Sequence, residues 1–227
     1  MTAKITTLIG TASFEVIRDK IALILFEEIA AQQVIAVADE EDPAMWKARV
    51  FTERNSPWEE FLNAPTDTSP IINVSFNDAT FDGFAGNRYE IQASLSRYWI
   101  DCIGYGKAAS TGATGHIPGD EASAIAAHRA GRLVRSILMS APWIDLGLSG
   151  TVTDKKVTRV SSNKPNSQDS AIQNITAVRV ELEVRHSELS PQNALGVLEE
   201  IRGIVYRGTT GQILANVTYE YPDPEEE

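Results

Sequence analysis

The segment Val178-Arg-Val-Glu-Leu-Glu-Val184 alternates aliphatic and charged side chains without interruption. Because successive side chains of a β-strand point to opposite faces, this period of two predicts a strand with one buried and one polar face. The strand is expected to run over residues 171–186, and residues 152–161 supply its partner in a hairpin. The polar residues 162–169 form the expected hairpin tip. The sequence therefore predicts an antiparallel sheet built around this hairpin.

Further strands are expected upstream of the hairpin. Ile72, Val74 and Phe76 alternate with polar residues, which indicates a half-buried strand. The segment 89–103 begins with the same alternation and ends in a nearly continuous apolar run, so its last part is expected to be covered on both faces. A shorter strand is expected within residues 47–54.

The N-terminal part follows the helical period instead. From residue 13 to about 33, apolar residues recur at intervals of three and four, with Ser13 as the expected N-cap. Leu23 and Phe26 project from the opposite side of this helix. Both of its faces therefore need cover, either from the fold itself or from another subunit.

A second helix is expected between Asp120, as its N-cap, and Pro142, because apolar residues again follow the helical period. Helices and strands are interspersed, but the strands form hairpins instead of alternating strictly with helices. We therefore expect an α+β fold whose mainly antiparallel twisted sheet is packed by the N-terminal amphipathic helix and the central helix. One domain is expected over residues 1–190.

The C-terminal residues 191–227 are expected to extend this domain. Ser190-Pro191 has the pattern of a helix start, and Ile201 and Val205 would lie on the apolar side of that helix. A strand over residues 211–221 and an acidic tail are expected to follow. The extension is thus predicted to contain a helix, a strand arm and a charged end.

Composition and charge narrow the classes of function. The 227 residues include 20 Lys and Arg against 31 Asp and Glu, a formal net charge of −11, which argues against a protein that binds phosphate backbones through charge. The single cysteine, Cys102, excludes an intramolecular disulfide and a cysteine-based zinc site, and it is expected to be buried. The apolar run 21–26 is too short to span a bilayer, and residues 1–10 show no signal-peptide pattern. We therefore expect a soluble protein made in the cytoplasm, without membrane contact.

The glycine-rich segment 104–119 is the strongest candidate for a cofactor site. It contains Thr111-Gly-Ala-Thr-Gly115-His-Ile-Pro-Gly119 before the expected central helix, and a phosphate site needs a strand, a glycine-rich turn and a helix N-terminus in that order. Residues 107–111 do not have the pattern of a strand, Pro118 interrupts the turn, and no Gly-Lys-Ser/Thr motif occurs. We expect a mobile surface loop here, with a nucleotide-binding enzyme as the alternative.

No other motif indicates catalysis or metal binding. His116, His128 and His186 are expected on a loop, a helix and a strand end, and they lack the spacing of a metal site. The G-x-S-x-G pattern of a nucleophilic serine does not occur in the sequence. We predict no catalytic residues, no cofactor and no metal.

Basic residues gather on one side of the expected central helix. At about 100° per residue, His128, Arg132 and Arg135 fall on one stripe opposite the apolar face, with Arg129 at its edge. Two interpretations remain open. The stripe is either a solvated helix face or a seam that meets the acidic surface of a neighbouring copy or another partner.

The order of the elements resembles that of one family of phage proteins. After the N-terminal helix come a proline-introduced strand, a tyrosine-rich strand, the central helix, a glycine-rich turn and the hairpin: Ser69-Pro-Ile-Ile-Asn-Val74, Tyr98-Trp-Ile-Asp-Cys-Ile-Gly104, Ala127-His-Arg-Ala-Gly-Arg-Leu-Val-Arg-Ser-Ile-Leu-Met139, Leu146-Gly-Leu-Ser-Gly150, and Val178-Arg-Val-Glu-Leu-Glu-Val184 with Glu188. Over residues 10–190 the sequence resembles the tail terminator or tail-completion proteins of tailed bacteriophages, especially those with contractile tails. The expected C-terminal helix, strand and acidic tail depart from the smallest members of that family.

The resemblance implies a non-enzymatic virion protein that assembles into a hexameric ring. Such a ring caps the tail tube, ends its polymerisation and joins the tail to the head connector. Its partners would be the tail tube protein, the head–tail connector or neck protein and, as a further candidate, the sheath protein. DNA would pass through a lumen lined by carboxylates without specific binding. The protein would reside in the tail-neck region of the virion, and in the host cytoplasm during assembly; another neck, collar or connector-adaptor ring protein is the alternative.

A closed ring requires head-to-tail contacts between unlike surfaces of neighbouring subunits. The residues expected at subunit or partner interfaces lie on both helices, at the hairpin tip and on the C-terminal strand: Leu23, Phe26, His128, Arg132, Arg135, Lys164, Asn166, Ile213, Val217 and Tyr219. We expect the C-terminal strand to act as an arm that lies against the next subunit or an adjoining ring.

Overall fold

The computed structural model describes residues 8–63, 66–81, 91–111, 115–163, 174–189, 200–207 and 212–220. The chain divides into two units, one comprising Gly10–Ser190 and the other Met1–Ile9 together with Pro191–Glu227. Each unit is described by itself.

The larger unit is built on a five-stranded sheet with the strand order β1-β2-β3-β7-β6. The strands are β1 (Arg49–Thr52), β2 (Ile71–Phe81), β3 (Ile91–Tyr105), β6 (Val152–Asn163) and β7 (Ile175–Leu189). Neighbouring strands pair antiparallel except β1, which runs parallel to β2. The predicted α+β fold with a mainly antiparallel sheet is confirmed, and a parallel strand at one edge is added to it.

The alternation in β7 decides which side chains of the central strands are buried. Val180 lies opposite Ile100 of β3 and Val160 of β6. The aliphatic residues from Val178 to Val184 are at most 2% exposed, while the charged residues between them face the other side of the sheet. A slip of one residue would exchange the two faces, so the hydrophobic pattern specifies this register strongly.

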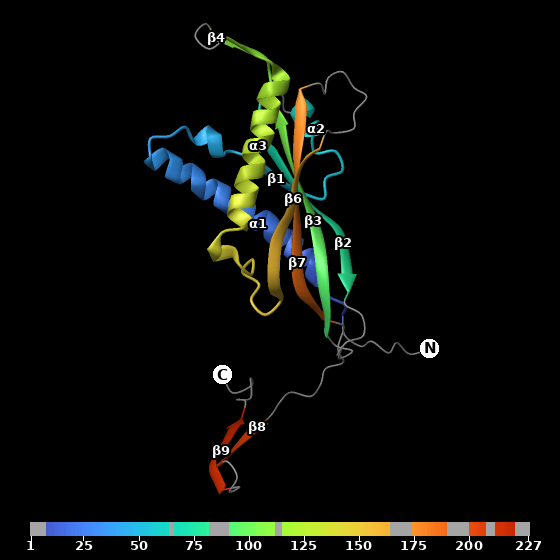
Figure 1. Ribbon diagram of the computed structural model, residues 1–227, viewed down its shortest axis with the longest axis vertical. Coiled ribbons are helices and arrows are strands. Elements are labelled where there is room, and N and C mark those ends of the chain that lie inside the picture. The colour runs from blue at the N-terminus through green and yellow to red at the C-terminus, as the bar shows by residue number, and fades with distance from the viewer. Residues whose placement is uncertain are drawn as a thin grey trace, which may run out of the picture. The chain divides into compact units, whose positions relative to one another are not determined.

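Two helices cover the apolar face of the sheet (Figure 1). α1 (Ser13–Ala38) and α3 (Gly119–Leu138) both pack on it. The fully buried side chains of the resulting core include Ile17, Ile21, Ile24, Leu25, Ile72, Val74, Ile100, Val134, Leu138, Val180 and Leu182. Each buried side chain of this size contributes about 1.5–3 kcal/mol relative to an exposed one, so this core is the main source of stability for the unit.

α1 begins and ends differently from the prediction. Its N-cap is Ala12, whose N–H donates to the Glu15 carboxylate (3.0 Å), and the predicted cap Ser13 is the first helical residue. The Ser13 N–H donates instead to Glu188 near the end of β7 (2.8 Å), a long-range partner that local pattern cannot reveal. The helix continues to Ala38. By length and composition alone it could cross a membrane, although its buried side chains belong to the core of this unit.

The glycine-rich segment 104–119 is more regular than predicted. β3 continues through Tyr105, and β4 (Ala109–Thr111) and β5 (Gly115–Ile117) form a small antiparallel hairpin. The prediction of a mobile loop is therefore wrong for these strands, because cross-strand pairing is not visible in the local sequence.

α3 starts two residues earlier than predicted. Pro118 has extended backbone angles and is the N-cap, so Asp120 already lies in the first turn. The Asp120 carboxylate accepts a hydrogen bond from the Glu121 N–H (2.9 Å). Its negative charge is still favourable there because the N-terminus of a helix carries partial positive charge.

The other face of the sheet carries paired charges. Arg97 of β3 pairs with Glu183 of β7 (3.0 Å), and Arg179 donates two hydrogen bonds to Asp101 (2.7 and 2.8 Å) while its guanidinium lies 4.0 Å from the centre of the Trp99 ring. At one end of this face, α2 (Glu59–Asn63) belongs to a smaller apolar cluster: Phe61, Ile71, Ile103, Ile175 and Ala177.

The smaller unit contains β8 (Glu200–Arg207) and β9 (Gln212–Glu220), which form a two-stranded antiparallel sheet. β9 confirms the predicted C-terminal strand. Residues 191–199 lie outside the described part of the chain, but the predicted helix is wrong over β8.

The error over β8 has a simple cause. Ile201 and Val205 are four residues apart, a spacing that fits one face of a helix and one face of a strand equally well. Both residues pair with β9, and the intervening sequence contains Gly203, which weakens a helix.

Candidate functional site: two docking surfaces

The outward side of α1 carries an apolar stripe. Val16, Leu23, Ala30 and Val37 recur every seven residues, a spacing that keeps them on one side of a helix. Leu23 is 44% exposed, Val37 63%, and Phe26 beside them 61%. Leu23 and Phe26 therefore project away from the core, as predicted, and their role in an interface stays a prediction.

A groove lies between this stripe and β1. It has a volume of about 440 Å³ and is lined by Ala22, Leu23, Phe26, Val50, Phe51 and Thr52. β1 ends the strand order, so within the described residues its outer side has no strand partner. An apolar groove beside an open sheet edge is suited to docking another chain. We call this surface the α1–β1 groove.

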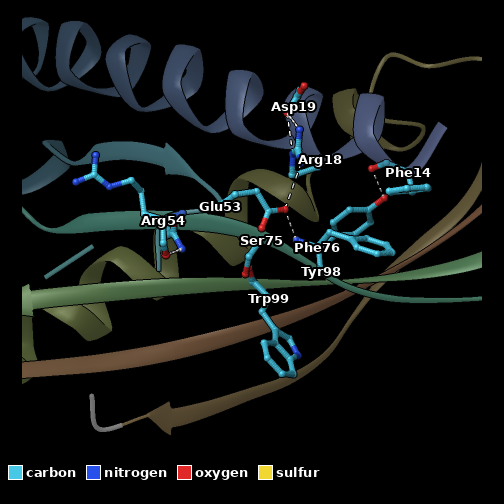
Figure 2. A network of polar contacts seen from close by, with 10 residues as sticks. Phe14, Arg18, Asp19, Glu53, Arg54, Ser75, Phe76, Tyr98 and Trp99 are labelled. Atoms are coloured by element: carbon cyan, nitrogen blue, oxygen red, sulfur yellow. Dashed lines mark hydrogen bonds and ion pairs between the residues drawn. The ribbon is translucent and has the colours of Figure 1, made fainter. Parts of the chain in front are cut away.

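Polar contacts around Glu53, beside this groove, connect α1 to the sheet (Figure 2). The Glu53 carboxylate accepts a hydrogen bond from the Phe76 N–H (2.9 Å) and pairs with Arg18 of α1 (3.3 Å). Nearby, the Tyr98 hydroxyl donates to the Phe14 carbonyl (2.9 Å). α1 is thus tied to both β2 and β3, and the outward stripe is held in a fixed direction.

The C-terminal end of α1 is exposed on several sides. After Ala30, the only buried residue of the helix is Ala36, whereas Val34 is 71% and Ile35 50% exposed. Four exposed acidic residues, 39–42, follow directly. Figure 1 shows this end of α1, in blue, extending beyond α3. We call residues 34–42 the α1 tip: an apolar helix end followed by a cluster of negative charge.

α3 presents the predicted basic residues on its outward side. His128, Arg132 and Arg135 are exposed, and Arg129 is half-buried with Nη1 3.0 Å from the Met45 sulfur. Burial, followed by the charge of Arg132, lowers the pKa of Arg129, so these cations repel one another. Among the described residues, neither Arg132 nor Arg135 has an ion-pair partner. The charge of Asp42 offsets part of the pKa lowering at Arg129, so the positive charge that has no ion pair in the described part of this side of α3 is that of Arg132 and Arg135.

A second groove runs between these basic residues and β6. It is lined by His128, Gly131, Arg132, Arg135, Ser136, Val160 and Val178. Val160 is 50% exposed, so the groove offers apolar surface beside the arginines. β6 stands at the opposite end of the strand order from β1. We call this surface the α3–β6 groove, and the two edges of the sheet thus carry unlike surfaces.

The remaining predicted interface residues are not part of these grooves. Lys164 and Asn166 lie outside the described residues. Ile213, Val217 and Tyr219 lie in β9, where each occupies a register position opposite β8. Their predicted contact with a neighbouring subunit stays a prediction.

The structure also brings together a group of polar side chains that the sequence did not predict. Ser96 Oγ lies 2.8 Å from Nε2 of His186, whose Nδ1 lies 3.8 Å from Glu188, an order similar to nucleophile, base and orienting acid. Ser96 is 0% and His186 1% exposed, so a substrate cannot reach the serine hydroxyl. The group is therefore a buried polar contact between β3 and β7. Its sequence signal was a pair of serines, Ser94 and Ser96, at positions where β3 otherwise buries apolar side chains.

Two features that could have indicated chemistry have structural roles. Cys102 is buried as predicted, and burial raises the pKa of its thiol, so the reactive thiolate is disfavoured. Gly104 and Gly106 let β3 and the chain after it approach α3: an added Cβ would lie 2.1 Å from the Ser123 carbonyl oxygen at the first and 2.1 Å from the Gly119 carbonyl oxygen at the second. Within the described residues, no cluster of His, Cys, Asp and Glu has the arrangement of a metal site.

Comparison with protein-family models and with curated proteins finds no match to this chain. The two docking surfaces are therefore the features of the molecule that bear on its function.

Proposed function

We propose that this protein is a structural subunit that assembles with its own copies into a ring, and that the ring is the tail terminator of a tailed bacteriophage virion. The observation that carries the first part is the difference between the two sheet edges. One edge has an apolar groove beside α1, and the other has a basic groove beside α3.

Unlike surfaces on opposite edges favour head-to-tail association. A contact related by a two-fold axis uses the same patch on both subunits, whereas a head-to-tail contact joins two different patches and gives a ring when the rotation closes. The exposed apolar residues of α1, such as Phe26 and Val34, are surface that such an interface would remove from water.

The C-terminal hairpin supports an assembly role in a second way. β8 and β9 form a sheet of only two strands, and an isolated two-stranded sheet is marginally stable in water. A hairpin of this kind gains stability when it packs on another chain or extends a sheet edge. We therefore propose that the C-terminal segment is an arm that contacts a neighbouring subunit or ring.

The terminator role itself depends on the sequence resemblance. In this proposal the ring caps the tail tube, stops its growth and contacts the head–tail connector, with the sheath protein as a further partner. The net charge of −11 suits a ring around a DNA path, because carboxylates in the bore repel the duplex and keep it from adhering.

The proposal is tested in two steps with the full-length chain. Light scattering and negative-stain images should show a particle of several-fold subunit mass with a central hole. Purified tail tubes incubated with the protein should then carry one ring at an end and stop growing when tube protein is added. A chain that stays monomeric at all concentrations would overturn the ring, and rings that bind portal-bearing heads but never tube ends would assign the protein to the collar or connector-adaptor class instead.

A further inference from the structure

The α3–β6 groove holds positive charge that lacks a partner in its own subunit. Arg132 and Arg135 line the groove, and neither forms an ion pair with a described residue. The charge of Arg132 also contributes to the lowered pKa of Arg129. An acidic segment placed in the groove would relieve this repulsion, and Val160 beside it would accept an apolar side chain.

The α1 tip has the complementary composition. Val34, Ile35 and Val37 are each at least half exposed, and the acidic residues 39–42 follow within one helical turn. The tip thus presents apolar surface and negative charge side by side, as the groove presents apolar surface and positive charge.

The two surfaces are also placed so that one molecule can use both at once. Met45, which follows the tip in η1 (Pro43–Trp46), lies against Arg129, and pockets on the two sides of the basic residues are lined by Met45 and Ile125 on one side and by Val160 on the other. The tip therefore lies on the side of α3 that faces η1, and the groove lies on the side that faces β6. A subunit can receive a neighbour's tip in its groove while its own tip remains available.

We propose that the α1 tip of one copy binds in the α3–β6 groove of the next copy. This inference rests on the proposed self-assembly and names the contact that produces it. The apolar residues of the tip pack near Val160, and Asp39 and Glu41 pair with Arg132 and Arg135.

A charge-exchange experiment tests the contact. The groove variant is Arg132→Glu with Arg135→Glu, and the tip variant is Asp39→Lys with Glu41→Lys. Asp42 is left unchanged because its carboxylate accepts the Ala44 N–H at the start of η1 (3.0 Å). All four altered side chains are exposed, so both variants should keep the circular dichroism spectrum and melting temperature of the native chain.

Each variant alone should need at least a tenfold higher concentration to assemble. The groove variant places two carboxylates opposite its own acidic tip, and the tip variant reduces residues 39–42 from four negative charges to a net charge of zero and places two lysines opposite its own arginines. An equimolar mixture should recover the mass of the native assembly, since the introduced lysines meet the introduced glutamates and the unaltered tip meets the unaltered groove. Arg185→Glu is the control for a change of charge, because Arg185 is exposed on the opposite face of the sheet; it should assemble like the native chain.

The outcomes separate this contact from the ring proposal. If the native chain forms rings and the mixture stays monomeric, the tip-to-groove contact is wrong and the ring stands. If the native chain and the mixture both stop at dimers while each variant alone is monomeric, the contact holds and the closed ring is wrong. A native chain that never associates overturns both.

Discussion

At the scale of single residues, the glycines at the end of β3 and directly after it show that a glycine-rich motif can have a packing role. A Cβ at Gly104 would meet the backbone of α3 at Ser123 and Ala127. Because backbone cannot rotate away as a side chain can, α3 would have to shift. The glycine-rich pattern that suggested a phosphate site is thus explained, at this position, by close helix–strand contact.

We predict that Gly104→Ala lowers the free energy of unfolding by about 3 kcal/mol, the upper end of the usual cost of overpacking. Gly10→Ala is the matched control, because nothing lies within 4 Å of a Cβ added there. Urea denaturation followed by circular dichroism measures both. Equal stability of the two variants would show that α3 does not depend on the close approach.

His186 predicts a pH dependence. Burial lowers its pKa from the ordinary value, despite the opposing effects of the Ser187 backbone and the Glu188 charge. As pH falls through about 6.5, the unfolded chain binds a proton at this histidine before the folded chain does, so this histidine lowers stability as the solution becomes more acidic.

We expect the melting temperature of the native chain to fall between pH 7.5 and 5.5, and His186→Gln to reduce that slope. Scanning calorimetry at matched ionic strength is the measurement. A His186→Gln variant with the full native slope would contradict the assignment to this residue.

At the scale of the elements, Glu53 connects α1 to β2. It has a positive φ of 52°, and its carboxylate holds both Arg18 and the Phe76 N–H. Glu53→Asn keeps a residue that tolerates this backbone conformation but shortens the side chain so that both contacts are lost.

The expected loss of stability in Glu53→Asn is about 1 kcal/mol, because the exposed Phe76 N–H loses its protein acceptor and Arg18 loses one ion pair. Asp19→Asn, which affects only the contact of Arg18 with its sequence neighbour, should change stability by less than about 0.5 kcal/mol. Hydrogen exchange of the α1 amides should also become faster in Glu53→Asn. Unchanged exchange would show that the core alone fixes the helix.

The elements differ in how far sequence alone could predict them. β7, α1 and α3 could be predicted from the sequence because their hydrophobic periodicity extends over many residues. β8 could not be predicted, because Ile201 and Val205 are four residues apart and this spacing fits both a helix and a strand. The N-cap of α1 was misplaced by one residue and that of α3 by two. At α1 the cause is that the Ser13 N–H donates to Glu188, far along the chain. For the candidate site, the orientation of Phe26 and Arg132 followed from helical spacing, but the grooves did not, because β1 and β6 become the outer edges only through strand pairing.

The exposed valines of the α1 tip allow assembly to be tested separately from folding. Val34→Ser with Val37→Ser should leave the unfolding free energy within about 0.5 kcal/mol of the native chain, since both side chains are mostly exposed. The same variant should assemble only at higher concentration. Sedimentation velocity at a series of concentrations is the measurement, and native-like assembly would show that these valines lie outside the interface.

At the scale of the whole molecule, the chain divides into a unit that contains the hydrophobic core and a unit that contains the β8–β9 hairpin. The unit Gly10–Ser190 contains both apolar clusters. The hairpin β8–β9 pairs only with itself in the described residues. The larger unit should therefore fold without the hairpin, while the hairpin should depend on contacts with other chains if it acts as an arm.

A chain that ends at Leu189 tests this division. It should keep the melting temperature of the native chain within a few degrees, because it retains all strands of the main sheet, and its particles should be smaller or absent in light scattering because the arm is missing. A chain that ends at Tyr221 removes only the acidic tail and should assemble like the native chain. Intact rings from the chain ending at Leu189 would exclude the hairpin as an assembly arm and assign ring closure to surfaces of the larger unit.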